Sequence, residues 1–352
     1  MTLEETLHAI QPVNAAIIQE AHRRQSAMAK PLGGLGLLEE TVNRIAGAQG
    51  TADVRIDKRC VVVFCADNGV VAQGVTQCGQ DVTATVTENL SKGDTTVCIM
   101  ARRAGVDVLP VDIGVARTVE GDKILRCKVM PGTRDMTVCP AMTREEAIQA
   151  VETGIGIALD CKSKGYQLVA TGEMGIGNTT TSSAVASVLL GLEPEAVTGR
   201  GAGLSTEGLM RKINAIRQSI ALHRPDASDP VDVIAKVGGL DIAGMVGLYL
   251  GGAMCNLPVV MDGFISAVAA LAAVRLCPAA WDYIVPSHVS AEPAGKRMLD
   301  ALHLQPLICA GMRLGEGTGA IAAISLLDLM VAVYHEMVRF DETNIEAYKP
   351  LT

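Results

Sequence analysis

Aromatic and charged residues are scarce in this sequence. Phe, Trp and Tyr together make up 3% of the 352 residues, and Trp281 is the only tryptophan. Few side chains are therefore available to stack on the bases of single-stranded nucleic acid. Charged residues account for 19%, and the formal net charge is -8. Because nucleic acid and anionic lipid both attract a basic surface, we expect no nucleic-acid or membrane partner, which leaves small molecules and other proteins.

Paired cysteines are also absent. The ten cysteines are scattered, without a C-x-x-C pair or a Cys/His pair at the spacing of zinc ligands. We interpret them as buried thiols of a reducing compartment and predict no metal site; a catalytic cysteine is the weaker alternative. Residues 1–13 lack the basic start and the apolar run of a signal peptide. These features together indicate a cytoplasmic protein.

One long uncharged stretch covers residues 242–260. It nearly reaches the length needed to span a membrane. However, it contains several glycines, and Asn256-Leu257-Pro258 interrupts it. We therefore predict a helix followed by a strand, and no membrane span.

Short β-branched runs recur between segments with helical periodicity. Hydrophobic residues make up 49% of the sequence, which excludes a disordered chain and requires a sizeable core. The alternation is typical of βαβ units, so we predict an α/β fold with a mostly parallel, Rossmann-like sheet flanked by helices. The predicted strands are residues 60–64, 107–113, 166–170, 258–261, 283–285 and 306–309.

Helix signals are clearest in two segments. Thr143 and Glu146 form a capping-box pattern, and an apolar stripe follows until Gly165. A second apolar stripe, over residues 209–220, has a basic opposite face. Both segments are predicted to be amphipathic helices.

Both ends of the sequence have helical patterns and no clear strand. At 352 residues, the chain is also more than twice as long as the roughly 150 residues of one typical domain. We therefore predict two domains, and expect the two ends to pack together in the smaller one. The large α/β domain is predicted over residues 49–320, and the small helical domain from residues 1–48 and 321–352.

Almost every predicted strand runs into a glycine-containing loop. In a parallel sheet, the loops that follow the strands meet at the carboxyl edge, where ligands bind. We therefore expect acidic residues of these loops to surround one cleft, although each taken alone is more often a loop cap. The acids considered are Asp67, Asp112, Glu173, Asp241 and Asp262.

Residues 172–180 form the richest of these loops. Its glycines let backbone N–H groups approach an anion, and Asn178, Thr179 and Thr180 would begin a helix whose N-terminus favours negative charge. This pattern predicts a phosphate site, with a tight turn without ligand as the alternative. Its spacing fits neither a P-loop nor a dinucleotide-binding fingerprint.

A second element directed at anions covers residues 199–203 and includes Gly201. Ser205 follows as a helix N-cap, and Lys212 lies two turns further along that helix. We predict that this element also faces the anion. A solvated basic helix face is the alternative.

Residues 311–319 place one carboxylate, that of Glu316, among glycines. Partial burial would raise the pKa of this group and suit it to act as a general base near neutral pH. We predict Glu316 as the catalytic residue, with a solvated loop glutamate as the alternative. His288 and His303 lack a partner pattern for a triad or a metal site, and we interpret His288 as loop or cleft lining.

Several motifs occur in a specific order along the chain. They are Gly-Glu-Met-Gly-Ile-Gly-Asn-Thr-Thr from residue 172, Lys-Val-Gly-Gly-Leu-Asp-Ile-Ala-Gly-Met from 236, Met-Asp-Gly-Phe from 261, Ser287-His288 to Glu292, and Met-Arg-Leu-Gly-Glu-Gly-Thr-Gly from 312. Together they resemble the nicotinate-nucleotide:dimethylbenzimidazole phosphoribosyltransferase family. The likeness extends from Lys30-Pro31 to the tail.

The resemblance implies transfer of the phosphoribosyl group of nicotinate mononucleotide to the lower-ligand base of a cobamide, with release of nicotinate. It implies no metal and no cofactor, since the mononucleotide is a substrate. Glu316 would take the acceptor's proton, Glu173 would lie near the ribose, and Lys212 would face the phosphate. The phosphate site would consist of Gly175, Gly177, Asn178, Thr179 and Thr180. We further predict Gly201 beside the donor, and Asp67, Asp241, Asp262 and Ser290 as supports of the cleft.

The segment 77–86 departs from the family's pattern on the acceptor side. Many members have an aromatic-Pro pair and then a Gln, where this chain has Cys78-Gly79 and then Thr85. The acceptor is therefore left open between dimethylbenzimidazole and another base or a phenol such as p-cresol. The predicted acceptor pocket consists of Cys78, Gly79, Thr85, Val86 and Leu314.

Three other functions are considered. One is a phenol-activating paralogue that works in a heterodimer, and another is a non-catalytic partner subunit, against which the retention of Glu316 counts. The third is a transferase using the pyrophosphate donor, but no apolar strand here ends in paired acids followed by Thr-Gly-Gly-Thr. We expect a homodimer, or a heterodimer with a paralogous subunit.

Overall fold

Strand β1 (Arg59–Ala66) lies in the middle of the sheet and is buried along nearly its whole length. The computed structural model describes residues 1–201 and 203–348. In it, β1 pairs in parallel with β2 (Asp107–Gly114) on one side and with β4 (Leu168–Met174) on the other. A continuous apolar run of this kind is typical of a parallel strand covered on both faces.

The sheet has six parallel strands in the order β3-β2-β1-β4-β5-β6. The remaining strands are β3 (Leu125–Arg126), β5 (Val259–Met261) and β6 (Ile284–Pro286). This confirms the predicted parallel α/β fold. The order is that of the doubly wound Rossmann sheet, in which ligands bind at the carboxyl edge where the direction of winding reverses, here between β1 and β4.

Two strand predictions need correction. The sequence predicts a strand over residues 166–170, whereas β4 continues to Met174, so that Glu173 lies in a strand and not in a loop. The strand predicted over residues 306–309 is wrong, because Ile308 forms only an isolated parallel bridge with His288. Pro306 has no N–H group to give to a strand ladder, which disfavours a longer pairing.

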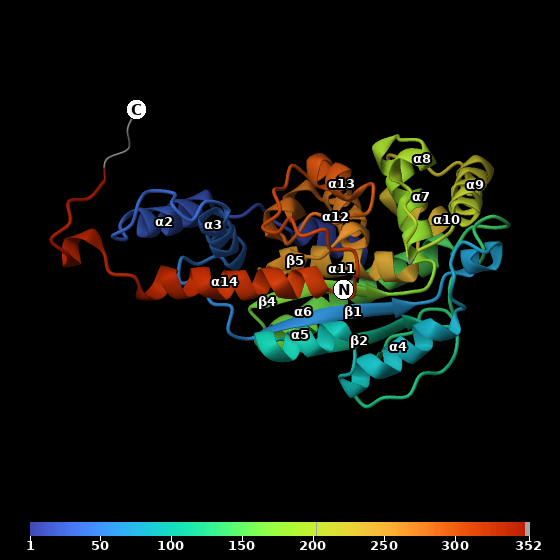
Figure 1. The fold of residues 1–352 in the computed structure, drawn as a ribbon, viewed down its shortest axis with the longest axis horizontal. Helices are drawn as coiled ribbons and strands as arrows, with labels where there is room; N and C mark the ends of the chain where they lie inside the picture. Colours follow the sequence, from blue (N-terminus) through green and yellow to red (C-terminus); the bar gives the residue numbers. More distant parts are fainter. Residues whose placement is uncertain (202, 349–352) are drawn as a thin grey trace.

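Helices cover both faces of the sheet (Figure 1). Alternate residues of β1 point to opposite faces: Val62 belongs to one core cluster and Val63 to the other. Most helical residues of the first cluster come from α6 (Arg144–Ser163), α7 (Asn178–Leu190), α10 (Pro230–Val237), α11 (Leu240–Met254), α12 (Phe264–Leu276) and α13 (Gly295–Leu302). Most of those of the second come from α3 (Leu37–Gln49), α4 (Asp81–Lys92), α5 (Thr96–Ala104) and α14 (Thr318–Glu336).

The shorter and peripheral elements complete the chain. They are α1 (Leu3–Ala9), α2 (Ala15–Ser26), α8 (Pro194–Val197), α9 (Thr206–His223) and the 3-10 turns Gly69–Gln73, Pro278–Tyr283 and Phe340–Glu342. Both helices expected from internal stripes are present, as α6 and α9. The capping box before α6 is confirmed, since the Thr143 hydroxyl accepts the N–H of Glu146 and the Glu146 carboxylate accepts that of Thr143.

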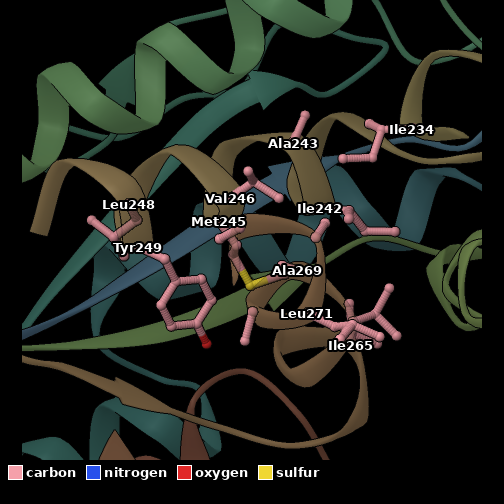
Figure 2. Packing of buried hydrophobic residues seen from close by; sticks show 14 of the residues in the cluster. Ile234, Ile242, Ala243, Met245, Val246, Leu248, Tyr249, Ile265, Ala269 and Leu271 are labelled. Carbon is pink, nitrogen blue, oxygen red and sulfur yellow. The ribbon is translucent and has the colours of Figure 1, made fainter. Parts of the chain in front are cut away.

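Helices α6 and α11 approach each other through glycines. A Cβ added at Gly154 of α6 would collide with the carbonyl oxygen of Gly244 in α11. On its other side, α11 packs against α12, and Figure 2 shows Met245 and Tyr249 among the apolar side chains of this core. The uncharged segment 242–260 thus consists of most of the buried helix α11, a turn and the start of β5, which is a helix followed by a strand as predicted.

Helix α14 is, by length and composition, long and apolar enough to cross a membrane. Half of its most apolar window is buried, and it packs against α5, α3 and β4. Such contacts are typical of a helix that belongs to a protein core. The only possible span that the sequence pattern suggested was residues 242–260, so this helix was not identified there.

The two ends of the chain meet beside the sheet. Met28 pairs with Arg339, and the hydroxyl of Tyr334 in α14 donates to the carbonyl of Ala52. Helix α2 packs on α3, which also contacts α14, whereas α1 contacts α6 and α11 of the large unit. The domain division at residues 48/49 and 320/321 stays a prediction.

Candidate active site

A cavity of about 210 Å³ opens at the carboxyl edge of the sheet. Loops after β4, β5 and β6 and the loop before α14 provide most of its walls. From the predicted site it contains Glu173, Gly175, Gly177, Asn178, Thr179, Gly201, Lys212, Asp262, Ser290, Leu314 and Glu316. Thus both predicted anion-directed loops and the predicted base line the same cavity.

One wall of the cavity is suited to an anion. The turn after β4 ends at Gly177, whose φ of 92° is left-handed, and α7 then begins with Asn178 and presents its N-terminus. Lys212 of α9 reaches this turn, and its Nζ donates to Thr179 Oγ1 at 2.7 Å. A Cβ added at Gly201 would lie 2.9 Å from Thr179 Oγ1 and 3.5 Å from the same Nζ, so a side chain here would crowd the hydroxyl that Lys212 contacts.

Lys212 is almost completely removed from water, with 1% of its surface exposed. Burial lowers the pKa of its ammonium group to about 8, and the carboxylate of Glu292 acts in the opposite direction. A bound phosphate would favour the charged form further. Thr180, the next predicted phosphate residue, is buried in the first turn of α7 and does not line the cavity.

At the start of α7, Asn178 links two buried carboxyl groups. Its Nδ2 donates to Glu173 Oε2 and, at 3.0 Å, to Asp241 Oδ2. Burial raises the pKa of Asp241 to about 6, and burial together with the nearby Asp241 raises the pKa of Glu173 well above its usual value. The pair therefore favours a single negative charge near neutral pH.

Glu316 stands in an unusual backbone conformation. Its φ is 59°, between Gly315 at 87° and Gly317 at 90°. A left-handed conformation costs a residue with a side chain roughly 1–2 kcal/mol, so surrounding contacts must hold it. Its N–H donates to Glu173 Oε1 at 3.4 Å.

The carboxylate of Glu316 is set up to accept a proton. Burial raises its pKa, the backbone N–H of Val97 acts in the opposite direction, and the charge of Asp262 raises it further. Its Oε2 is buried and has no hydrogen-bond partner among the described residues. A desolvated carboxylate with a free oxygen at the wall of a cavity has the properties of a general base.

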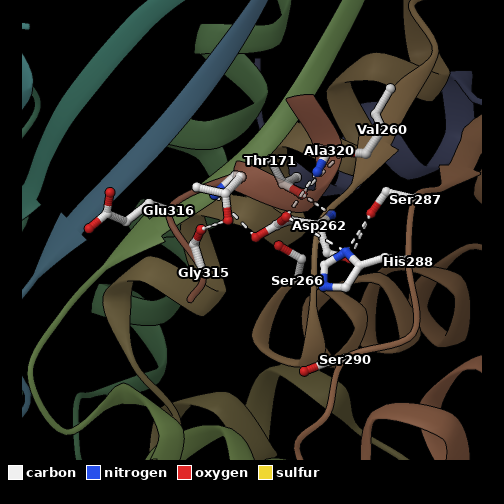
Figure 3. A network of polar contacts seen from close by, with 12 residues as sticks. Thr171, Val260, Asp262, Ser266, Ser287, His288, Ser290, Gly315, Glu316 and Ala320 are labelled. Carbon is white, nitrogen blue, oxygen red and sulfur yellow. Dashed lines mark hydrogen bonds and ion pairs between the residues drawn. The ribbon is translucent and has the colours of Figure 1, made fainter. Parts of the chain in front are cut away.

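Asp262 and His288 lie behind the Glu316 loop (Figure 3). Asp262 follows β5 directly, is buried, and accepts N–H groups from Gly317 and Ala320. Burial raises the pKa of Asp262, and His288, whose Nδ1 lies 4.0 Å from Asp262 Oδ1, acts in the opposite direction. His288 itself lines the cavity.

The expected ring of acids is wrong in one respect, because only Glu173 and Asp262 of the five line the cavity. Asp112 accepts the N–H of Val115 and lies 3.3 Å from the ammonium of Lys128. Asp67 accepts the N–H of Ala116. Asp67 and Asp112 therefore stabilise the loop after β2, since each accepts a backbone N–H group of that loop.

The predicted acceptor residues lie mainly outside the cavity. Leu314 lines it and is 54% exposed, whereas Cys78, Gly79, Thr85 and Val86 do not line it. Those four lie in the turn before α4 and in its first turns, and Thr85 donates its hydroxyl hydrogen to the carbonyl of Asp81. Their role at the acceptor stays a prediction.

Sequence reasoning did not identify several cavity residues. They are Val75, Thr76, Gln77, Met174, Ile176, Arg200, Leu204, Gly263, Phe264, Ile265, Ser266, Glu292, Arg313 and Gly315. Half of them stand directly beside a predicted residue, so adjacency was the available signal for those. Within residues 1–201 and 203–348, no group of three or more His, Cys, Asp and Glu side chains could hold a metal ion.

Comparison with known proteins gives one consistent result. A family model described as phosphoribosyltransferase matches residues 10–345. The nicotinate-nucleotide–dimethylbenzimidazole phosphoribosyltransferase of Ruminiclostridium cellulolyticum is 48% identical over 351 residues and covers 100% of both chains, and that of Acetivibrio thermocellus is 47% identical and covers 99% of both. The crystal structure of CobT from Thermus thermophilus is 38% identical, covers 94% of this chain and 99% of its own, and has a TM-score of 0.89.

Proposed function

This chain belongs to the nicotinate-nucleotide–dimethylbenzimidazole phosphoribosyltransferase family, and from that premise we infer the reaction that it catalyses. It is a pentosyltransferase that moves the 5-phosphoribosyl group of nicotinate mononucleotide to 5,6-dimethylbenzimidazole or a related lower-ligand base of a cobamide. The bond between C1' and the nicotinate nitrogen breaks, and a bond between C1' and a nitrogen of the base forms. The base loses one proton, and the products are the α-ribotide phosphate and nicotinate.

One observation carries this function: an anion site and a desolvated carboxylate line the same cavity. Lys212, Thr179 and the N-terminus of α7 suit the 5'-phosphate of the donor, and Glu316 suits the proton of the acceptor. The donor and the acceptor would thus be bound side by side in one cavity. This removes much of the entropic cost of bringing two substrates together.

The charge of the cavity also fits the chemistry of the donor. Nicotinate leaves as a neutral ring nitrogen, because that nitrogen carries a positive charge in the mononucleotide, so the departure requires no acid. Positive charge develops on the ribose as the bond breaks. Preorganised carboxyl groups at Glu173 and Glu316 would stabilise that charge.

Glu316 then accepts the proton that the base loses. A benzimidazole attacks through its unprotonated nitrogen, and the N–H of its other nitrogen becomes acidic as the new bond forms. The free Oε2 of Glu316 can receive that hydrogen, and its raised pKa makes the transfer favourable near neutral pH.

The chemical identity of the acceptor is a further part of the proposal. The relatives compared above carry the dimethylbenzimidazole name, and nothing among them favours the phenol-activating or the non-catalytic alternative. We therefore propose a benzimidazole acceptor. A cytoplasmic enzyme that needs no cofactor and forms a homodimer, or a heterodimer with a paralogous subunit, is part of the same proposal.

The test is an assay of the purified chain alone. It is incubated with nicotinate mononucleotide and, in separate reactions, with dimethylbenzimidazole, adenine and p-cresol, and both nicotinate and the ribotide phosphate are measured. We expect equal amounts of the two products with dimethylbenzimidazole. Absence of both products in every mixture would contradict the catalytic function of the chain, and product with p-cresol alone would contradict the benzimidazole acceptor.

A further inference from the structure

The loop that carries Glu316 contains three consecutive residues with left-handed backbone. Glu316 is the only one of the three with a side chain, and its φ of 59° is not the conformation that such a residue prefers. Because the isolated loop would relax, contacts elsewhere must hold it in this form. Those contacts determine where the carboxylate of Glu316 lies.

Asp262 contacts the residues that follow Glu316 in the chain. Its Oδ2 accepts the N–H of Gly317 at 3.1 Å, and its Oδ1 accepts the N–H of Ala320 at 3.0 Å. These groups belong to the first turn of α14, where free N–H groups and the helix dipole both favour an anion. The N–H of Glu316 itself is accepted by Glu173. The Glu316 loop is thus held between two carboxyl groups.

Asp262 is itself fixed by the sheet. It follows the last residue of β5, and its N–H donates to Thr171 Oγ1 of β4 at 3.1 Å. Its carbonyl accepts the hydroxyl of Ser287 at 3.2 Å, and the same hydroxyl lies 3.0 Å from His288 Nδ1. Both oxygens of the Asp262 carboxylate are therefore aimed at α14 by two neighbouring strands.

The side chain of Glu316 points away from Asp262 (Figure 3). The two carboxyl groups have no contact of their own, and the connection between them runs through the backbone of Gly317. Asp262 therefore differs from a residue that holds Glu316 by a direct hydrogen bond. It determines the conformation of the peptide that follows Glu316.

We propose that Asp262 is the positioning residue for Glu316, and that it keeps the Glu316 carboxylate aimed at the acceptor by anchoring Gly317 and Ala320. This inference rests on the proposed role of Glu316 as the base. A displacement of a catalytic group by about 1 Å can reduce a rate by about 100-fold, so loss of the anchor affects the chemical step more than donor binding.

The charge of Asp262 also affects the titration of Glu316. The charged or titratable groups around the loop are Glu173 of β4, Asp241 of α11, His288 after β6 and Arg313 of the loop itself. In addition to these groups, Asp262 lies near, and its negative charge raises the pKa of Glu316. Removal of the charge of Asp262 must lower the pKa of Glu316. Glu316 would then stay deprotonated, and able to act as a base, at lower pH than in the wild type.

The test compares Asp262→Asn with Asp229→Asn. Asp229 is a matched control, because it caps α10 by accepting the N–H groups of Val231 and Asp232 but does not line the cavity. The single-turnover rate of transfer is measured from pH 5 to 9, together with donor affinity by calorimetry and thermal stability. Wild type and Glu316→Gln are included.

We expect Asp262→Asn to reduce the single-turnover rate at least about tenfold, to change donor affinity less than about threefold, and to move the acidic limb of the rate profile to lower pH. Asp229→Asn should change stability alone. If Asp262→Asn keeps the wild-type rate and limb while Glu316→Gln is inactive, Asp262 is only a helix cap and the proposal is wrong. An inactive wild type would instead contradict the proposed function.

A second variant keeps the test decisive if Asp262→Asn does not fold. Asp262→Glu retains the charge but shifts it by one methylene. We expect a reduced rate with the acidic limb near its wild-type position, because position changes and charge does not. A wild-type rate in this variant would show that the position of the anchor is unimportant.

Discussion

The ammonium group of Lys212 donates a hydrogen bond of 2.7 Å to the hydroxyl of Thr179, although the two residues come from different helices, 33 positions apart. The contact joins α9 to the first turn of α7. It places a buried cation beside a helix N-terminus. This pair is the strongest structural reason to locate the donor phosphate here.

Replacement of Lys212 by Ala should weaken donor binding. A charged hydrogen bond to a phosphate contributes about 1.5–3 kcal/mol, so we expect KM for nicotinate mononucleotide to rise roughly 10- to 100-fold. Steady-state kinetics measure this, with Arg217→Ala as the control for loss of an exposed charge on the same helix. An unchanged KM would remove Lys212 from the donor site.

Donor binding should also depend on pH. Burial lowers the pKa of Lys212 to about 8, so the ammonium loses its proton as the pH rises through this value. The attraction for the phosphate is present below pH 8 and is lost above it. We expect kcat/KM for the donor to fall above about pH 8, and Lys212→Ala to lack this basic limb. A basic limb that persists in the variant would have to come from another group.

Glu316→Gln should separate binding from chemistry. The amide has nearly the same shape but cannot accept the acceptor's proton, so we expect turnover to fall about 100-fold or more. Donor affinity, measured by calorimetry, should remain within a few-fold of wild type. Full turnover in a folded variant would show that another group, such as Glu173, takes the proton.

Asp241→Asn should increase stability at neutral and alkaline pH. Burial raises the pKa of this carboxyl from 3.8 to about 6, so the folded protein binds its proton more tightly than the unfolded chain does. The resulting stabilisation is complete below about pH 4 and is lost as the pH rises through 6. Asparagine is never charged, so we expect a gain of about 1–3 kcal/mol at pH 8 that shrinks below pH 6. Urea unfolding at several pH values measures it, and a pH-independent difference would contradict the assignment.

Two glycines of α6 provide a matched pair of substitutions. A Cβ at Gly154 would collide with the backbone of α11, whereas Gly156 is exposed and has nothing within 4 Å of the same position. We expect Gly154→Ala to destabilise the protein by about 1–3 kcal/mol, and Gly156→Ala to stabilise it by about 0.5–1 kcal/mol. Thermal unfolding would distinguish them, and equal effects would contradict the close approach of the helices.

The sequence alone determined the class of fold and the chemistry of the loops. A run such as Cys60 to Phe64 has enough β-branched and apolar side chains to specify a buried strand, and Thr143 with Glu146 specifies a helix start, because both signals depend on near neighbours. Motif order was sufficient to identify the family. The glycines around Glu316 also indicated a carboxylate in a constrained loop before any contact was known.

Only the tertiary structure decided which acids line the cavity and how Glu316 is held. Asp67 and Asp262 each follow a strand, yet one stabilises a neighbouring loop and the other anchors α14. Asp262 and Gly317 are 55 positions apart. The direction of a side chain after a strand depends on the twist of the sheet and on the partners that the sheet brings near. The local sequence does not specify the twist or these partners, because the hydrogen bonds form only when distant segments pack together.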